Sequence, residues 1–128
     1  MDKNITILLA EDDSLLRDLY EQAFRLVGYH IEIAIDGQDA VDKLDHMSQL
    51  PGLILLDMMM PRMSGFDVLR YLKHSEKYKD IQVIILSNVA EQEAIDNALK
   101  LGASNYLIKT DYVPSEIVAK VGEMMVKK

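Results

Sequence analysis

Several polar side chains directly follow short apolar runs of the sequence, where the carboxyl ends of strands are expected. They are Glu11, Asp12, Asp13, Asp57, Ser87 and Lys109. Carboxylates that converge at one edge of a sheet cannot all stay ionised unless a cation joins them. Oxygen ligands that leave room for water suit Mg²⁺, with Mn²⁺ as an alternative, better than they suit zinc. The pattern therefore predicts a divalent cation site with a hydroxyl and an ammonium group beside it.

Taken one at a time, these residues have simpler interpretations. An Asp or a Ser after a strand is more often a helix cap or a turn residue than a ligand, and a single Lys is usually a solvated charge. Asp13 and Asp36 both fit the role of a cap. The coincidence of acids, a hydroxyl and a lysine at the ends of several strands favours a shared site over unrelated caps.

Two other residue types have a structural interpretation. The run 58–60 consists of three methionines, which we expect to pack the loop after the strand that precedes Asp57, because Met is an adaptable core filler. The three histidines fall on separate elements, away from the strand ends, and we expect them on the surface. They are His30, His46 and His74.

Five apolar runs predict the strands that would position the polar residues: 5–10, 30–35, 53–56, 81–86 and 105–108. The run 5–10 is almost entirely apolar, which is typical of a central parallel strand. The run 30–35 alternates, with Ile31, Ile33 and Ile35 on one face. This alternation indicates a strand nearer the sheet edge.

Apolar residues three and four positions apart predict an amphipathic helix after each strand. The first begins at Asp13 or Ser14 and stops at Gly28. Its apolar stripe consists of Leu16, Leu19, Tyr20, Ala23, Phe24 and Val27. The apolar stripes of the later helices fall within residues 40–47, 64–72, 94–101 and 114–125.

Strands that alternate with helices predict an α/β fold with a parallel sheet, because parallel neighbours cannot be joined by tight hairpins. We expect a three-layer αβα sandwich of the flavodoxin-like type, with five strands in the order 2-1-3-4-5. The switch point of that order lies between the first and third strands, where up to four carboxylates would meet, those of Glu11, Asp12, Asp13 and Asp57. Five strand–helix units are too few for an eight-unit barrel.

The composition limits the function further. The chain has 128 residues and a formal net charge of −7, which argues against nucleic acid as a partner. It contains no Cys, which removes disulfides and thiolate chemistry and suits a reducing compartment. The apolar run near the N-terminus is too short for a signal peptide or a membrane span. We expect one cytoplasmic domain over residues 1–128, with no output domain and no membrane insertion.

One combination of residues extends over almost the whole chain: Glu11-Asp12, Asp57, Met60-Pro61, Gly65, Ser87, Tyr106 and Lys109. Together these residues resemble the receiver domain of bacterial two-component response regulators, of the single-domain type found among chemotaxis regulators. The resemblance implies a signalling switch that catalyses only its own phosphorylation and dephosphorylation.

The resemblance also implies roles for individual residues. Asp57 would accept the phosphoryl group, and Asp57, Asp12 and the backbone carbonyl of Met59 would bind Mg²⁺, with Glu11 acting through a water molecule. Counting back from Arg17 sets this register and leaves Asp13 as the helix cap.

Three further residues would respond to the phosphoryl group. By the resemblance, Ser87 would bond a phosphoryl oxygen, and Lys109 would pair first with the carboxylate and then with the phosphoryl group. Tyr106 would change rotamer between the two states. The phosphoryl donor would be a phosphohistidine on a sensor histidine kinase or on a histidine phosphotransfer protein. The output would be a downstream protein target, and the domain would be a monomer or a weak phosphorylation-dependent dimer.

Some positions depart from the family pattern. Thr110 follows Lys109 where the family usually has proline, and Asn88 replaces a very small residue. Met59 and Val89 stand where the family commonly tunes self-dephosphorylation. Two apolar groups there would hinder the attacking water, so we expect a long-lived phosphoryl group.

Other classes fit the sequence less well. An FMN-binding flavodoxin needs a Ser/Thr/Gly-rich loop after the first strand, where this chain has three acids. A phosphatase of the haloacid dehalogenase type normally has a second acid two residues after its nucleophile, where this chain has Met59. A degenerate receiver that binds proteins without being phosphorylated stays open, as does a piece of a longer regulator.

Overall fold

The computed structural model describes residues 5–125. Five parallel strands form one sheet in the order β2-β1-β3-β4-β5. The strands are β1 (Thr6–Ala10), β2 (His30–Ala34), β3 (Leu53–Leu56), β4 (Gln82–Ser87) and β5 (Asn105–Ile108). The predicted α/β fold and strand order are confirmed.

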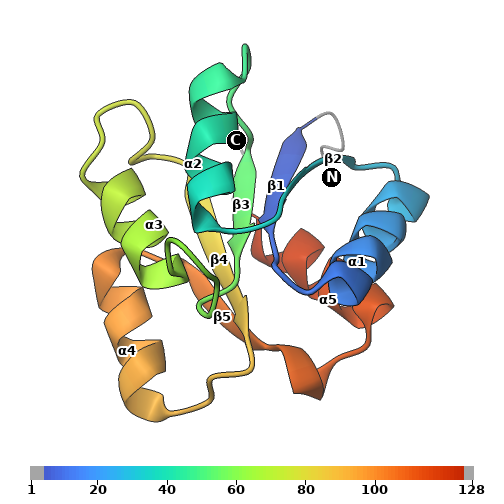
Figure 1. The fold of residues 1–128 in the computed structure, drawn as a ribbon. Helices are drawn as coiled ribbons and strands as arrows, with labels where there is room; N and C mark the ends of the chain where they lie inside the picture. The colour runs from blue at the N-terminus through green and yellow to red at the C-terminus, as the bar shows by residue number, and fades with distance from the viewer. Residues whose placement is uncertain (1–4, 126–128) are drawn as a thin grey trace.

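Five helices cover the two faces of the sheet. They are α1 (Ser14–Val27), α2 (Gly37–His46), α3 (Gly65–Lys73), α4 (Gln92–Leu101) and α5 (Pro114–Met124). Figure 1 shows α1 and α5 on one face and α2, α3 and α4 on the other. A short 3₁₀ helix, η1 (Lys109–Asp111), connects β5 to α5 and was not predicted.

The two cores follow from the alternation of side chains along the strands. In β1, Ile7 and Leu9 point to the α1 and α5 side, where they pack with Phe24. Leu8 and Ala10 point to the opposite side and join the core beneath α2, α3 and α4. Because every β1 residue after Thr6 is buried, the strand is covered on both faces, as its apolar sequence indicates.

Four apolar residues predicted to face the core do not do so, and one of them is Leu99 of α4, which is 42% exposed. Ile35 is 51% exposed because β2 ends one residue earlier, at Ala34. Leu19 and Val27 are 40% and 39% exposed, since α1 packs on the sheet mainly through Tyr20 and Phe24. The apolar stripe of α1 is therefore narrower than its sequence pattern suggests.

Candidate functional site

Carboxylates from two neighbouring strands meet at the carboxyl edge of the sheet. Glu11 and Asp12 follow β1, and Asp57 follows β3. Ala10 pairs with Leu56, so the next residue of each strand lies beside the other, and the Asp57 N–H donates to the Ala10 carbonyl at 3.2 Å. Carboxylate oxygens of all three acids lie within 4.8 Å of one another. The register of β1 and β3 thus builds the acid cluster predicted at the switch point.

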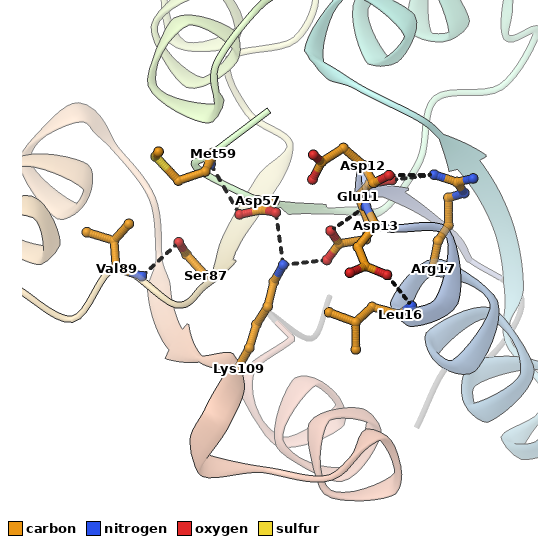
Figure 2. Close-up of polar contacts among 10 residues, drawn as sticks. All are labelled: Glu11, Asp12, Asp13, Leu16, Arg17, Asp57, Met59, Ser87, Val89 and Lys109. Atoms are coloured by element: carbon orange, nitrogen blue, oxygen red, sulfur yellow. Dashed lines mark hydrogen bonds and ion pairs between the residues drawn. The ribbon is translucent and has the colours of Figure 1, made fainter. Parts of the chain in front are cut away.

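Lys109 reaches this cluster from the end of β5. Its Nζ lies 2.6 Å from Oε1 of Glu11 and 2.9 Å from Oδ2 of Asp57. Figure 2 shows the ammonium between the two carboxylates. The three side chains are 8% (Lys109), 1% (Glu11) and 6% (Asp57) exposed, so this is a buried ion-pair network rather than a surface salt bridge.

The electrostatics of the network leave an excess of negative charge. Burial raises the pKa of Glu11 to about 7, although the hydrogen bond and charge of Lys109 act in the opposite direction. Burial alone would lower the pKa of Lys109, but its bonds to Glu11 and Asp57 outweigh that effect and raise it. One ammonium group faces two buried carboxylates and the exposed Asp12. A further cation is the group that would relieve this imbalance.

The donor set fits a hard divalent cation. Carboxylates of Glu11, Asp12 and Asp57 are oxygen ligands, and the exposed Asp12 leaves one side of the cluster open to water. Mg²⁺ prefers such sites, because it retains several of its waters when it binds protein carboxylates.

Asp13 belongs to the helix and not to the cluster. Its Oδ1 accepts a hydrogen bond from the Leu16 N–H at 3.0 Å, which makes it the N-cap of α1. Arg17 donates from Nη1 to the carbonyls of Glu11 (2.9 Å) and Asp12 (3.3 Å) (Figure 2). Asp13 is therefore the cap, as predicted, and Arg17 secures the backbone of the two preceding acids.

Ser87 and Tyr106 converge on the loop between β4 and α4. Ser87 is fully buried at the end of β4, and its Oγ accepts from the Val89 N–H at 3.2 Å. Tyr106, on β5, donates its hydroxyl to the Val89 carbonyl at 2.6 Å. Burial raises the pKa of the Tyr106 phenol. Val89 thus links two of the three side chains predicted to respond to phosphorylation.

The methionine run separates into different environments. Met58 is 2% exposed and packs in the core, and Met60 packs partly against it. The side chain of Met59 is 68% exposed, so its predicted packing role is wrong. The Met59 N–H instead donates to Oδ1 of Asp57 at 3.2 Å. The histidines at 30, 46 and 74 are exposed, as predicted.

The position of Lys109 does not require a cis bond at Thr110, the residue that replaces the proline usual in this family. All peptide bonds within residues 5–125 are trans. The chain turns instead through η1, which the Tyr112 N–H closes by donating to the Lys109 carbonyl at 3.3 Å. Asn88, the other departure beside the site, is exposed.

Two contacts near the site were missed by sequence reasoning. Asp36 was predicted only as a cap, but it also forms a bidentate ion pair with Arg62, which lies in the loop that follows Asp57. Gly65 packs so closely that a Cβ there would lie 2.2 Å from the Asp57 carbonyl oxygen. The glycine was part of the recognised pattern, but nothing in the sequence indicated the partner of Arg62.

Comparisons with known proteins identify the family of this chain. The family model for the response regulator receiver domain matches residues 7–121. The phosphate regulon transcriptional regulatory protein PhoB of Pseudomonas aeruginosa is 34% identical over 116 residues, which are 91% of this chain and 49% of PhoB. A probable transcriptional regulator, ycf27 of Cyanophora paradoxa, is 31% identical over 93% of this chain and 47% of its own length. The chain thus spans about half the length of these curated relatives.

Solved structures show the same fold. The receiver domain of the Francisella response regulator 1452 has a TM-score of 0.83 and 27% identity, with 95% of this chain and 97% of that chain covered. The Mn²⁺-bound form of response regulator Rcp1 has a TM-score of 0.84 and 25% identity, with 93% and 92% covered. Within residues 5–125, no helix combines the length and apolar character needed to cross a membrane. The chain belongs to the response regulator receiver domain family of two-component systems.

Proposed function

We propose that Asp57 accepts a phosphoryl group in a Mg²⁺-dependent reaction and that the resulting acyl phosphate switches a protein-binding surface. The observation that carries this proposal is the buried Asp57 carboxylate, 2.9 Å from the Lys109 ammonium and within an acid cluster that has too few counter-charges. Carboxylate nucleophiles form covalent phosphoryl intermediates of this kind.

The donor would be a phosphohistidine on a sensor histidine kinase or a histidine phosphotransfer protein. A carboxylate oxygen of Asp57 forms the new bond to phosphorus while the phosphorus–nitrogen bond of the donor breaks and the imidazole leaves. Phosphoryl transfer depends mainly on positioning and on neutralising charge on the phosphoryl oxygens. Lys109 supplies one positive charge, and its contact with Glu11 holds the ammonium in place while Asp57 changes its bonding.

Asp12, Asp57 and the Met59 carbonyl would hold Mg²⁺, with Glu11 acting through a water molecule. When bound, the ion would neutralise negative charge on the phosphoryl oxygens. Response regulator Rcp1, which has the same fold, has been solved in a Mn²⁺-bound form, and this likeness supports a divalent cation in the present chain.

The response would pass through the loop between β4 and α4. Ser87 accepts a hydrogen bond from Val89 through its oxygen, so its hydroxyl hydrogen can be donated to a phosphoryl oxygen. A phosphoryl group adds nearly two negative charges and three acceptor oxygens. Movement of Ser87 toward these oxygens would disturb Val89 and, through its carbonyl, Tyr106. The altered face of α4, β5 and α5 would then bind a downstream protein.

The net charge of −7 and the absence of Cys bear on the partner of this domain and on its cellular compartment. The charge favours a protein over nucleic acid as the direct partner of this domain. A chain without Cys fits a reducing compartment such as the cytoplasm. If the domain belongs to a longer regulator, as in relatives about twice its length, the other parts of that regulator would add further functions.

The test is incubation with acetyl phosphate and Mg²⁺, followed by intact mass measurement. We expect the wild type and an Asp18→Asn variant, which changes an exposed acid on α1, to gain one phosphoryl group. Asp57→Asn should gain none. A gain that persists in Asp57→Asn would refute Asp57 as the acceptor, and no gain in the wild type would favour the alternative, an unphosphorylated protein-binding module.

A further inference from the structure

The loop after Asp57 is tied to a helix that contributes nothing to the acid cluster. This loop, residues 58–64, connects β3 to α3. Arg62 donates from Nε to Oδ2 of Asp36 at 2.7 Å and from Nη2 to Oδ1 at 3.0 Å. Asp36 is 5% exposed and is also the N-cap of α2, since its Oδ1 accepts from the Asp39 N–H at 2.8 Å. One buried carboxylate thus joins α2 to the loop.

The backbone of the loop is also held closely against the start of α2. A Cβ on Gly37 would lie 1.9 Å from the carbonyl oxygen of Met63, so only glycine permits this approach. Arg62 itself has a φ of 65°, in the left-handed region that non-glycine residues rarely adopt. Such a conformation persists only where surrounding contacts enforce it. The bidentate ion pair with Asp36 is such a contact.

The start of the loop is bonded to Asp57, and the two ends of the loop are bonded to each other. The Met59 N–H donates to Oδ1 of Asp57, and the Gly65 N–H donates to the Met58 carbonyl at 3.0 Å. Met59 therefore lies between an anchor at Asp57 and the anchor of Arg62 on Asp36. Because the Met59 carbonyl belongs to the backbone, its position depends on both of these contacts.

We propose that Arg62 is a positioning residue whose ion pair with Asp36 holds the Met59 backbone where its carbonyl would bind the cation, and thereby sets the affinity of the site for Mg²⁺. This inference rests on the metal site of the proposed function. It adds that α2, through Asp36, contributes to metal affinity without touching the metal.

If Arg62 and Asp36 acted only through their charges, substituting them would have opposite effects on Mg²⁺ binding. Removing the positive charge of Arg62 would strengthen the binding of a cation nearby, whereas removing the negative charge of Asp36 would weaken it. Positioning predicts weaker binding in both cases, because either change releases the loop. Supporting residues around metal ligands commonly change metal affinity by 10–100-fold, and we expect a loss of about tenfold here.

The experiment is calorimetric titration of the unphosphorylated protein with Mg²⁺, together with Tm measured without metal. Arg62→Gln and Asp36→Asn should both raise the Kd for Mg²⁺ about tenfold; Asn remains a good N-cap, so α2 keeps its start. Arg62→Lys keeps the positive charge but loses the planar guanidinium that forms the bidentate bond. Its Kd for Mg²⁺ should therefore be close to that of Arg62→Gln. The double variant should be no weaker than the single ones, because the pair is already broken.

The control is Arg70→Gln, which removes an arginine of similar exposure that pairs with Asp67 on α3. It should leave the Kd unchanged. If Arg62→Gln binds Mg²⁺ as tightly as the wild type or more tightly, the positioning role is wrong, even where its Tm falls. If Arg62→Gln does not fold, Arg62→Lys and Asp36→Asn decide the question by the same criterion. If the wild type takes up no Mg²⁺, the metal site of the proposed function fails and this role fails with it.

Discussion

The Nζ of Lys109 lies 2.9 Å from Oδ2 of Asp57, although the two residues are 52 positions apart in the sequence. The contact crosses β4, because Asp57 follows β3 and Lys109 follows β5. Lys109 also contacts Glu11, so a single ammonium stabilises two buried carboxylates. The same pairing that stabilises the fold places a positive charge beside the proposed nucleophile.

Replacing Lys109 separates these two effects. Lys109→Gln leaves the carboxylates of Glu11 and Asp57 buried without their counter-charge, and we expect a loss of about 3 kcal/mol in the free energy of unfolding without Mg²⁺. Added Mg²⁺ should recover much of this loss, since a ligand that binds only the native state stabilises it. Urea unfolding with and without Mg²⁺ measures both quantities.

The same variant should bind Mg²⁺ more tightly and yet accept phosphate from acetyl phosphate more slowly. Lys100→Gln, which changes an exposed lysine on α4, is the control and should alter neither property. A stable Lys109→Gln protein that is phosphorylated at the wild-type rate would contradict the role of Lys109 in neutralising the phosphoryl oxygens.

We expect the lifetime of the proposed acyl phosphate at Asp57 to depend on two apolar residues, Met59 and Val89. Figure 2 shows Met59 and Val89 on the side of Asp57 that lies away from Glu11. Neither side chain can orient a water molecule by hydrogen bonding as an amide or carboxylate does. We expect Met59→Asn and Val89→Glu to shorten the half-life several-fold, measured by mass after removal of the phosphate donor. Met60→Leu, which keeps an apolar side chain at a part-buried position, serves as the control. Faster loss of phosphate from the wild type than from both variants would overturn this explanation.

The ends of β1, β3 and β5 and the acid cluster could be predicted because they depend on local patterns. A buried parallel strand has an almost continuous apolar sequence, so the end of β3 before Asp57 was predicted at its observed position. The strand order then brought Glu11, Asp12 and Asp57 together without any knowledge of side-chain contacts.

The contacts of loops could not be predicted in this way. Arg62 meets Asp36 across 26 residues only because the loop takes a left-handed turn, and no periodicity encodes that turn. Ile35 continued the alternation of β2, but Asp36 is needed as the cap of α2 and so the strand ended first. Capping and tertiary contacts outweighed local pattern at both places.

Tyr78 gives the protein a stability contribution that is lost in alkaline solution. Its ring is buried, and its hydroxyl donates to Oδ1 of Asp45 on α2 at 2.5 Å. Burial and then this bond raise the pKa of Tyr78 from its ordinary value of 10.0 to about 12. The ring of Tyr71 and the ammonium of Lys77 also face the Tyr78 ring. The Lys77 ammonium lies 5.5 Å from the centre of that ring.

Because the native state holds the Tyr78 proton more tightly, the contribution is complete below pH 10 and declines as the pH rises toward 12. Tyr78→Phe should cost about 1 kcal/mol at pH 8, through loss of the hydrogen bond. The difference between wild type and variant should shrink above pH 10. Tyr112→Phe, which removes the hydroxyl of a part-buried tyrosine packed against the other core, should leave the wild-type profile unchanged. A difference that stays constant to pH 11 in urea unfolding would show that the native pKa of Tyr78 is not raised.

Asp36 should have the opposite dependence, in acid. The hydrogen bonds from Arg62 lower the pKa of Asp36 below its ordinary value of 3.8, and the backbone N–H groups of Asp39 and Gln38 act in the same direction. Asp39 and Asp42 also face the guanidinium of Arg62.

The unfolded chain therefore takes up the Asp36 proton first, so the stabilisation is complete well above pH 3.8 and is lost as the pH falls through the lower native pKa. The difference in free energy of unfolding between wild type and Asp36→Asn should be constant from pH 7 to about pH 5 and should decrease below that. In an Arg62→Gln background the hydrogen bonds that chiefly lower the pKa of Asp36 are absent. The decrease of this free-energy difference below about pH 5 should then be much smaller. Urea unfolding of the four proteins at pH 7, 5 and 3 measures this coupling. An equal decrease in both backgrounds would mean that the N-cap bonds, and not Arg62, hold the carboxylate of Asp36 ionised.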